Sequence, residues 1–367
     1  MSILYIANIR FPTEKAHGLQ IAKTCEAFAR LGHEVELMVT DRATPITEEA
    51  FSYYRIKTTF PITRIHVPDT VRFGHIGFWL ETYRFARGCL KALRTKHFDV
   101  LYGRDELVLA HIGRRIDAPI VWETHVGADN RCTRFLARRA IRVVAITQGL
   151  KDFYIGLGVP AGKIVVAPDG VDPGDFEHTE GKENARRRLG LPQDKKIAMY
   201  IGRLDGWKGS DTFLEASALL PGSTLAAVIG GEPQQVAAAR VRYPDVVFSG
   251  YRPYRELPGN QIAADVLVLP NTAKDEVSLR FTSPLKLFTY MVSGVPMVVA
   301  DLPSIREIVD EECTFFFTPD EPRALASAIE DALANDERSR AKAQNAYTRV
   351  MRYSWDARAR AILEALK

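Results

Sequence analysis

Short apolar runs alternate with amphipathic stretches along the first half of the chain. The runs are rich in residues that favour strands, and the stretches between them carry apolar residues at helical spacing. Strand, helix and strand in this order form βαβ units, so we expect a parallel sheet covered by helices. The expected strands are 3–7, 35–39, 99–102, 119–123 and 143–146, and the expected helices are 19–31, 106–116 and 148–157.

A turn-rich, strongly charged segment at 169–195 predicts a linker followed by an entry helix. After it the alternation starts again, and the last residues, 355–367, form an amphipathic stretch that could cross back to the first half. The expected strands here are 197–201, 224–229, 246–249, 266–269, 297–300 and 314–317, and the expected helices are 210–220, 232–243, 284–293 and 321–335.

The pattern therefore predicts an α/β protein of two doubly wound domains that face a cleft. Residues 1–170 together with the C-terminal helix 354–367 form the first domain, and residues 171–353 form the second. A chain of 367 residues has the usual length for two domains. Ligands of such sheets bind outside the carboxyl ends of the strands.

Composition narrows the class of protein. Hydrophobic residues make up 46% and charged residues 26% of the chain, which is ordinary for a globular protein. The net charge of +4 does not mark a nucleic-acid binder. The four cysteines are widely spaced, which argues against disulfides and zinc and favours a reducing compartment. We find no signal peptide and no membrane-spanning run, so we expect a cytoplasmic protein.

Positive charge gathers in the N-terminal half, where residues 51–150 carry 17 Lys and Arg against 8 Asp and Glu. Residues 72–96 mix aromatic with basic side chains, and Arg131, Arg134, Arg138 and Arg142 recur at helical spacing. Such a surface fits the inner face of a membrane or a lipid-phosphate acceptor. Domain helices with a solvated basic face are the alternative.

The stretch from Ser283 to Gly294 predicts a helix with marked ends. Ser283 is the expected N-cap, Pro284 the first helical residue and Gly294 the terminator. The start of a helix attracts anions, whereas Lys286 in the first turn opposes the helix dipole. A diphosphate beside Ser283, Pro284, Leu285 and Lys286 would explain this lysine. An ordinary capped helix with a solvated lysine is the alternative.

A second signal lies where the strand at 197–201 ends. Gly202 opens a tight turn, and Arg203 and Lys208 flank a glycine-containing loop that enters the next helix. Arg and Lys here fit a clamp for a pyrophosphate, although solvated charges in a turn are the alternative. Gly18, expected just before a helix, would let the backbone approach a ligand closely. The absence of a GxGxxG motif counts against a dinucleotide cofactor.

His125 follows a predicted strand, two residues after Glu123, and both side chains are expected to point toward the cleft. It could contact a sugar or support a transition state, and a structural histidine is the alternative. No Asp-x-Asp triplet occurs in the chain. Metal-assisted transfer from sugar nucleotides uses such a carboxylate pair, so we expect no metal and no cofactor.

Several blocks, taken in order, resemble the family-4 retaining glycosyltransferases of the GT-B fold. The blocks are EKAHG at 14–18, ETH at 123–125, ITQGLK at 146–151, PDGVD at 168–172, GRLDGWK at 202–208, SPLKLFTYMVSGVPMVVA at 283–300 and DLPSIRE at 301–307. The resemblance implies two Rossmann-like domains, acceptor-binding and then donor-binding. It also implies that Arg203 and Lys208 bind the donor diphosphate, that Gly18 lies near the phosphates, and that the catalytic His125 contacts the donor sugar.

The chain departs from this family at two positions. The family usually carries two glutamates eight positions apart, for the donor sugar and the ribose, and the matching residues here are Phe281 and Thr289. Thr289 offers a single hydroxyl to a ribose, so a charge-assisted bond worth ~1.5–3 kcal/mol is lost. Glu276, five residues before Phe281, is a substitute that we consider.

The function expected from the resemblance is retaining, metal-independent transfer of a sugar from a UDP- or GDP-sugar, as in polysaccharide biosynthesis. The acceptor would be a glycan or a lipid-linked molecule, with peripheral membrane contact through the basic domain and no nucleic acid. A catalytically impaired relative that binds sugar nucleotides or a partner transferase is one alternative. An unrelated two-domain epimerase or phosphorylase is another.

Overall fold

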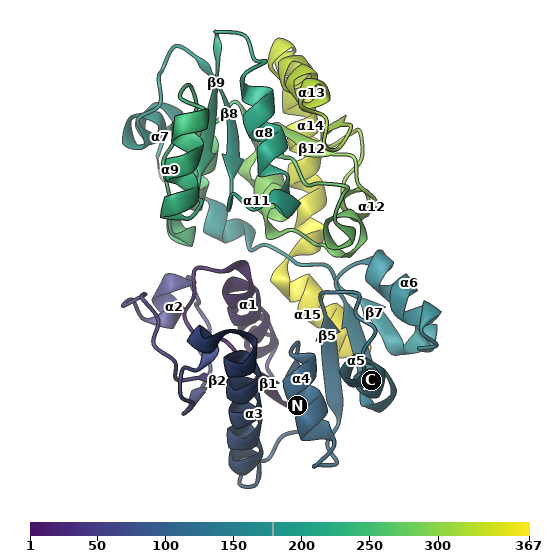
Figure 1. Ribbon diagram of the computed structural model, residues 1–367. Helices are drawn as coiled ribbons and strands as arrows, with labels where there is room; N and C mark the ends of the chain where they lie inside the picture. Colours follow the sequence, from purple (N-terminus) through teal and green to yellow (C-terminus); the bar gives the residue numbers. More distant parts are fainter. Residues whose placement is uncertain (178–179) are drawn as a thin grey trace. The chain divides into compact units, whose positions relative to one another are not determined.

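The computed structural model describes residues 1–177 and 180–367, and the chain folds as two compact units. The first unit comprises Met1–Pro168 and Trp355–Lys367, and the second comprises Asp169–Ser354. Figure 1 shows a sheet with helices packed around it in each unit. Of the predicted linker at 169–195, residues 178–179 lie outside the described part of the chain.

The first unit is built on a parallel sheet with the strand order β3-β2-β1-β4-β5-β6-β7. Strand β1 lies inside the sheet and pairs with β2 from Ser2 opposite Glu34 and with β4 from Ile3 opposite Val100. Its residues are almost wholly buried, as expected for a strand covered on both faces. The strands are β1 (Ser2–Ile6), β2 (Glu34–Thr40), β3 (Ile62–Ile65), β4 (Val100–Gly103), β5 (Ile120–Thr124), β6 (Arg142–Ala145) and β7 (Ile164–Val166).

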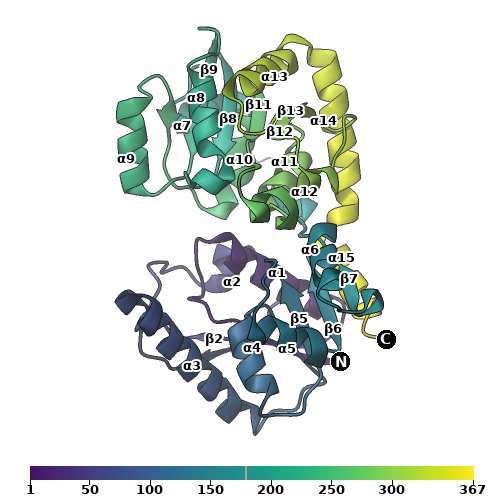
Figure 2. The ribbon, with the colours of Figure 1, turned by 45° about the vertical axis from the view of Figure 1, so that its right-hand side comes forward.

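Helices cover both faces of this sheet because the chain reverses its direction across it. The chain winds from β1 to β3 one way and from β3 to β7 the other, and right-handed crossovers then place α1 opposite α3, α4 and α5. The last three lie next to one another in Figure 2. The helices are α1 (Ala16–Arg30), α2 (Ala50–Tyr53), α3 (Gly74–Leu93), α4 (Glu106–Gly113), α5 (Arg131–Arg139), α6 (Gln148–Gly156) and α15 (Trp355–Glu364).

The second unit repeats this architecture with a parallel sheet of order β10-β9-β8-β11-β12-β13. Its core is formed by apolar side chains of these strands and the helices around them. The strands are β8 (Lys196–Ile201), β9 (Thr224–Ile229), β10 (Val247–Phe248), β11 (Val266–Leu269), β12 (Met297–Ala300) and β13 (Phe315–Phe317).

The helices of the second unit again cover both faces. Helix α13 packs against α8 on one face, and α14 packs against α11 on the other. The helices are α7 (Lys182–Leu189), α8 (Ser210–Ser217), α9 (Pro233–Arg242), α10 (Leu257–Ile262), α11 (Leu285–Ser293), α12 (Pro303–Arg306), α13 (Pro322–Ala334) and α14 (Asp336–Val350), with a π-helical turn at Val277–Phe281.

The predicted fold class is confirmed, including the C-terminal helix, because α15 packs on α1 of the first unit. The pattern missed the edge strands β3 and β7, which are only 4 and 3 residues long. It also missed α14, whose exposed charged positions dilute its apolar stripe. Within residues 1–177 and 180–367, no helix combines the length and the apolar character needed to cross a membrane.

Candidate functional site

A buried carboxylate organises the carboxyl edge of the first sheet. Glu123, near the end of β5, is fully buried, and its Oε1 accepts hydrogen bonds from Gln20 Nε2 at 2.5 Å and from His125 Nε2 at 2.6 Å. Its Oε2 accepts from the Tyr102 hydroxyl and lies 2.9 Å from Arg358 Nη2. Burial alone would raise the pKa of Glu123, but Arg358 and the hydrogen bonds from His125 and Tyr102 hold it well below its usual range.

His125 is oriented and kept neutral by these surroundings. Burial and the nearby Arg104 guanidinium lower its pKa to about 4, although Glu123 acts in the opposite direction. Because ionised Glu123 only accepts, Nε2 of the neutral imidazole carries the hydrogen and Nδ1 is left as an acceptor. Burial, Arg104, Lys15 and His125 likewise lower the pKa of His17 to about 4. His17, Arg104 and His125 therefore form one electrostatic cluster, of which the sequence had indicated only His125.

Gly18 lies inside the first turn of α1, two residues after the helix begins at Ala16, so its predicted place just before the helix was wrong. A Cβ at this position would lie 2.2 Å from the Tyr54 hydroxyl oxygen and 2.5 Å from Thr13 Cγ2. Tyr54 in turn accepts from Thr13 N at 2.7 Å and donates to Thr13 O at 2.8 Å. The glycine is therefore needed for packing inside the protein, whatever ligand approaches it.

In the second unit, the loop after β8 gathers basic side chains around one carboxylate. Asp205 Oδ2 lies 3.1 Å from Arg203 Nε and 3.4 Å from Lys208 Nζ, and Arg203 Nη1 also lies 3.5 Å from Glu232. Burial lowers the pKa of Lys208, although Asp205 acts in the opposite direction. The predicted pair Arg203 and Lys208 thus lies together at the carboxyl end of the central strand.

Lys286 joins this loop from the first turn of α11. Its Nζ lies 4.4 Å from the centre of the Tyr200 ring and donates to the Tyr200 hydroxyl at 3.3 Å. Burial and the charge on Lys208 lower the pKa of Lys286 to about 7. A Cβ at Gly202 would lie 3.0 Å from this nitrogen, so the glycine makes room for the lysine. Lys286 forms no ion pair with any residue in the described part of the chain.

The start of α11 differs from the sequence prediction. Pro284 is the N-cap, with an extended backbone, and Leu285 is the first helical residue, so Ser283 as N-cap and Pro284 as first residue were wrong. The Ser283 hydroxyl instead accepts a hydrogen bond from Asp169 N at 3.0 Å. The residue before a proline also disfavours helical geometry. Gly294 does end the helix, with φ of 70°.

At the two positions where the family usually carries glutamate, this chain has Phe281 and Thr289, and the structure engages both side chains within the protein. Phe281 is 1% exposed and belongs to the buried residues of the chain. The Thr289 hydroxyl accepts from Gln261 Nε2 at 3.1 Å and donates to Lys286 O at 3.0 Å, so its one hydrogen is already used within the protein. Glu276 is exposed and lies 3.8 Å from Arg280.

Glycines that the sequence analysis did not single out shape the same edge of the second sheet. Gly209 has a φ of 68°, and a Cβ there would lie 1.6 Å from Pro270 O. Gly230 has a φ of 114°, and its Cβ would lie 2.3 Å from Gly202 O. These two positions require glycine, and the dipeptide Gly230-Gly231 was the available signal. Among the described residues, no three His, Cys, Asp or Glu side chains gather as a metal-binding group.

Two family models match the chain, one in each unit. The model described as Glycosyltransferase Family 4 matches residues 19–175, and the model described as Glycosyl transferases group 1 matches residues 195–335. The matches cover most of both sheets and include His125, Arg203 and Lys286.

Curated relatives match parts of the chain. A putative teichuronic acid biosynthesis glycosyltransferase, TuaC, of Bacillus subtilis is 28% identical over 165 residues, which are 45% of this chain and 40% of that protein. A D-inositol 3-phosphate glycosyltransferase of Kineococcus radiotolerans is 28% identical over 255 residues, which are 62% of this chain and 57% of that protein. The chain thus spans about half the length of these relatives.

The fold has solved counterparts. The Anabaena protein HepE, crystallised with UDP and glucose, aligns over 100% of this chain and 99% of its own, with a TM-score of 0.79 and 19% identity. At this identity the likeness concerns the fold alone. With two Rossmann-like parallel-sheet units and a family model matched in each of them, the chain belongs to the family-4 glycosyltransferases of the GT-B fold.

Proposed function

We propose that the protein is a retaining, metal-independent glycosyltransferase that takes a sugar from a nucleoside-diphosphate sugar and transfers it to a glycan or lipid-linked acceptor. The observation that carries the proposal is the cation cluster of Arg203, Lys208 and Lys286 at the carboxyl edge of the second sheet. Asp205 and Glu232 are the carboxylates paired with it, so a bound diphosphate would supply the missing negative charge.

The cluster could also take the place of the metal that an Asp-x-Asp triplet, which this chain lacks, would hold against the phosphates. Arg203 and Lys208, together with Lys286, which a bound diphosphate would hold in its protonated form, and the free N–H groups at the start of α11 can neutralise the leaving diphosphate directly. The diphosphate would then help to remove the proton from the acceptor hydroxyl, and neutral His125, held by Glu123, would contact the donor sugar through Nδ1. We take UDP as the nucleotide because HepE was crystallised with it.

A catalytically impaired relative that binds sugar nucleotides is the second candidate function. It is favoured by buried Phe281 and by Thr289, because neither offers the carboxylate that the family uses on the donor. This candidate requires nucleotide binding without transfer. Release of UDP from UDP-glucose in the presence of a glycan acceptor, compared with UDP binding, separates the two functions.

Calorimetric titration of UDP, GDP and ADP, with and without EDTA, tests the donor site. We expect UDP to bind equally well with EDTA, and Arg203→Ala to weaken binding about 10- to 100-fold, since a hydrogen bond to a charged group is lost. Arg340→Ala is the matched control, because Arg340 is an exposed arginine on α14 of the same unit. Binding that needs a divalent metal, or that survives Arg203→Ala unchanged, would contradict the proposal.

We propose further that α3 contacts an anionic membrane surface. Ile76, Trp79, Leu80 and Tyr83 are 84%, 58%, 40% and 45% exposed and lie on one face of the first half of the helix. Tryptophan and tyrosine beside an aliphatic residue are typical of a bilayer interface. We call these four residues, with the basic residues that follow them, the α3 face.

Basic residues continue the α3 face toward the C-terminal end of the helix. Arg84, Arg87, Lys91 and Arg94 are exposed there, and Glu81 is the single acidic residue between 72 and 94 and is fully buried. Positive charge next to exposed apolar side chains complements anionic headgroups. This arrangement favours a membrane over a solvated helix face, since solvation explains the charges but not the exposed apolar residues.

Co-sedimentation with vesicles tests this contact. We expect binding to vesicles that contain phosphatidylglycerol, little binding to pure phosphatidylcholine, and weaker binding at high salt. The double variant Ile76→Ser/Trp79→Ser should bind at least about tenfold more weakly, because most of its apolar contact is removed. Val241→Ser, at a residue 85% exposed on α9, is the control. Equal binding of both variants would contradict the proposal.

A further inference from the structure

A small cavity opens at the carboxyl ends of β4 and β5 in the first unit. It measures about 170 Å³. At about 30 Å³ each it would hold roughly six water molecules, and it is smaller than the usual pocket for a whole drug-sized ligand. Its size therefore suits one ring of a larger molecule. Its walls are formed by Arg104, Asp105, Glu106, Trp122, Thr124, His125, Val126, Thr133 and Tyr154.

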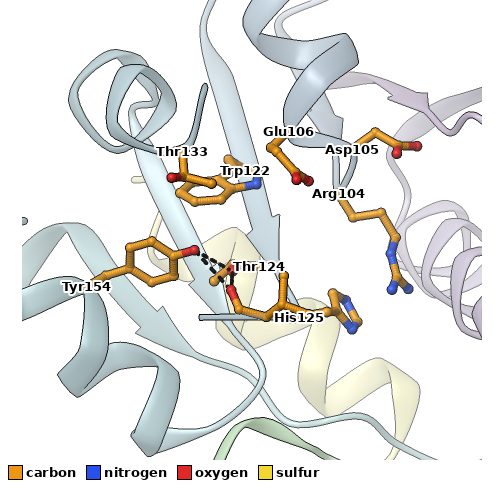
Figure 3. A pocket seen from close by; sticks show the side chains of 9 residues that line it. Arg104, Asp105, Glu106, Trp122, Thr124, His125, Thr133 and Tyr154 are labelled. Atoms are coloured by element: carbon orange, nitrogen blue, oxygen red, sulfur yellow. Dashed lines mark hydrogen bonds between the residues drawn. The ribbon is translucent and has the colours of Figure 1, made fainter. Parts of the chain in front are cut away.

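Two polar groups in this cavity have no hydrogen-bond partner among the described residues. Trp122 is 2% exposed, and its indole Nε1–H is buried without an acceptor. The Glu106 carboxylate, in the first turn of α4, lines the same cavity and forms no hydrogen bond or ion pair within the described part of the chain. Figure 3 shows the Glu106 carboxylate on the side to which the indole nitrogen points.

The two hydroxyl groups beside this pair are already engaged. The Tyr154 hydroxyl donates to Val126 O at 3.0 Å, and Thr133 donates to Ala128 O at 2.8 Å. A buried donor without a partner is costly, typically by 1–3 kcal/mol, and is rare in native proteins. The cavity thus holds one buried donor and one carboxylate acceptor ready for a ligand.

The chemistry of the lining selects the ligand. A carboxylate accepts O–H bonds from neighbouring hydroxyls, and an indole N–H donates to a hydroxyl oxygen, so the pair matches a molecule whose groups both donate and accept. Asp105 and Glu106 outnumber Arg104 in the lining, which disfavours an anionic ring such as a phosphate ester or a uronate. The edges of Trp122 and Tyr154, with ring centres 5.1 Å apart, give the wall an apolar part.

We propose that this cavity is a subsite for one neutral sugar ring of the acceptor, with Glu106 and the Trp122 indole N–H binding its hydroxyl groups. The assignment to the acceptor rests on the proposed transferase function, whereas the binding of a sugar ring rests on the cavity alone. His125 lines the same cavity, so a ring held there lies against the residue expected to contact the donor sugar. Glu106 and Trp122 then determine which acceptors are used.

Saturation-transfer NMR with methyl glucoside, methyl galactoside and methyl mannoside tests the subsite in the full-length chain. We expect at least one of these sugars to bind, and methyl glucuronoside to bind more weakly than the neutral glycosides. Glu106→Gln and Trp122→Phe keep the shape of the wall and remove one partner each, so each should weaken binding about tenfold or more.

The matched control is Glu183→Gln, because Glu183 is also an acidic residue in the first turn of a short helix, α7 of the second unit. It should bind the glycosides as the parent protein does. UDP binding measured on the same samples separates the two proposals, since it depends on the second unit. Retained UDP binding with no glycoside binding, or with glycoside binding unchanged in Glu106→Gln and Trp122→Phe, would overturn the subsite and leave the transferase proposal standing.

Discussion

At the scale of single residues, the buried ion pair between Glu123 and Arg358 supports both the position of His125 and the attachment of the C-terminal helix. Both side chains are almost completely buried, and Glu123 simultaneously holds His125, so one carboxylate joins the C-terminal helix to the site. A buried charge is tolerated only when it is paired and hydrogen-bonded. Arg358 is therefore a positioning residue for His125, acting through Glu123.

Arg358→Met should destabilise the first unit by about 3–5 kcal/mol near pH 7, because it leaves Glu123 buried without its cation. In the parent protein the pKa of Glu123 is depressed, so its stabilising contribution is present above the pKa of the unfolded chain and is lost only as pH falls through the folded pKa. Without Arg358, we expect burial to raise the pKa of Glu123, so that the carboxylate takes up a proton as pH falls toward 5. The loss of unfolding free energy relative to the parent protein should therefore be smaller at pH 5 than at pH 7.

Urea unfolding of both proteins at pH 7 and pH 5 measures this difference. Arg360→Met is the control, since Arg360 lies two residues further along α15 and is exposed. The pairing argument fails if Arg360→Met lowers the free energy of unfolding as much as Arg358→Met does. It also fails if Arg358→Met lowers this free energy equally at both pH values.

At the scale of elements, the first turn of α1 is fixed by close packing against Tyr54. Gly18 is buried there, and the Tyr54 hydroxyl bonds the backbone of Thr13 just ahead of the helix. The loop before α1 and the first turn of the helix, which carries His17, are thus held against the segment after α2. Any side chain at position 18 must displace one of these neighbours.

Gly18→Ala should therefore destabilise the protein by about 1–3 kcal/mol, although alanine is the better helix former. Gly156→Ala is the matched control, because Gly156 is also helical and a Cβ there would meet nothing within 4 Å. This control should be neutral or stabilising by up to about 1 kcal/mol. Thermal unfolding of the two variants and the parent protein measures both changes in stability. Equal changes for Gly18→Ala and Gly156→Ala would refute the packing argument.

At the scale of the whole molecule, the first unit is built from two separate segments of the chain, Met1–Pro168 and Trp355–Lys367. Helix α15 buries Trp355, Ala359 and Ile362 and packs on α1, with Arg30 2.6 Å from Asp356. The first unit is therefore incomplete without residues 355–367. The second unit, Asp169–Ser354, is continuous in sequence.

Deletion of residues 355–367 should loosen the first unit and spare the second. Hydrogen–deuterium exchange should rise in α1 and β5, which lose apolar contacts and the partner of Glu123, while β8, β9 and β11 stay protected. Exchange that rises equally in both units, or in neither, would show that α15 does not complete the core of the first unit.

Much of the fold could be predicted from local pattern. The central strands β1, β4, β5, β8 and β11 were expected close to their observed bounds because strands buried on both faces appear as continuous apolar runs. Short edge strands such as β3 and β7 lack that signal. The start of α11 was misplaced because Ser283 found a partner in Asp169, a contact that spacing within the segment does not reveal.

By itself the sequence determined the two parallel sheets, the pairing of Arg203 with Lys208 in one loop, and the glycine that ends α11. The sheets follow from the alternation of strand and helix patterns along the chain, and the other two features follow from residues that are close in sequence. The tertiary structure alone decided that Arg358 meets Glu123, that Lys286 joins the loop after β8, and that Glu106 and Trp122 share a cavity. The burial, the pKa and the free hydrogen-bonding capacity of these side chains depend on neighbours that only folding brings together. A local sequence pattern therefore cannot predict them.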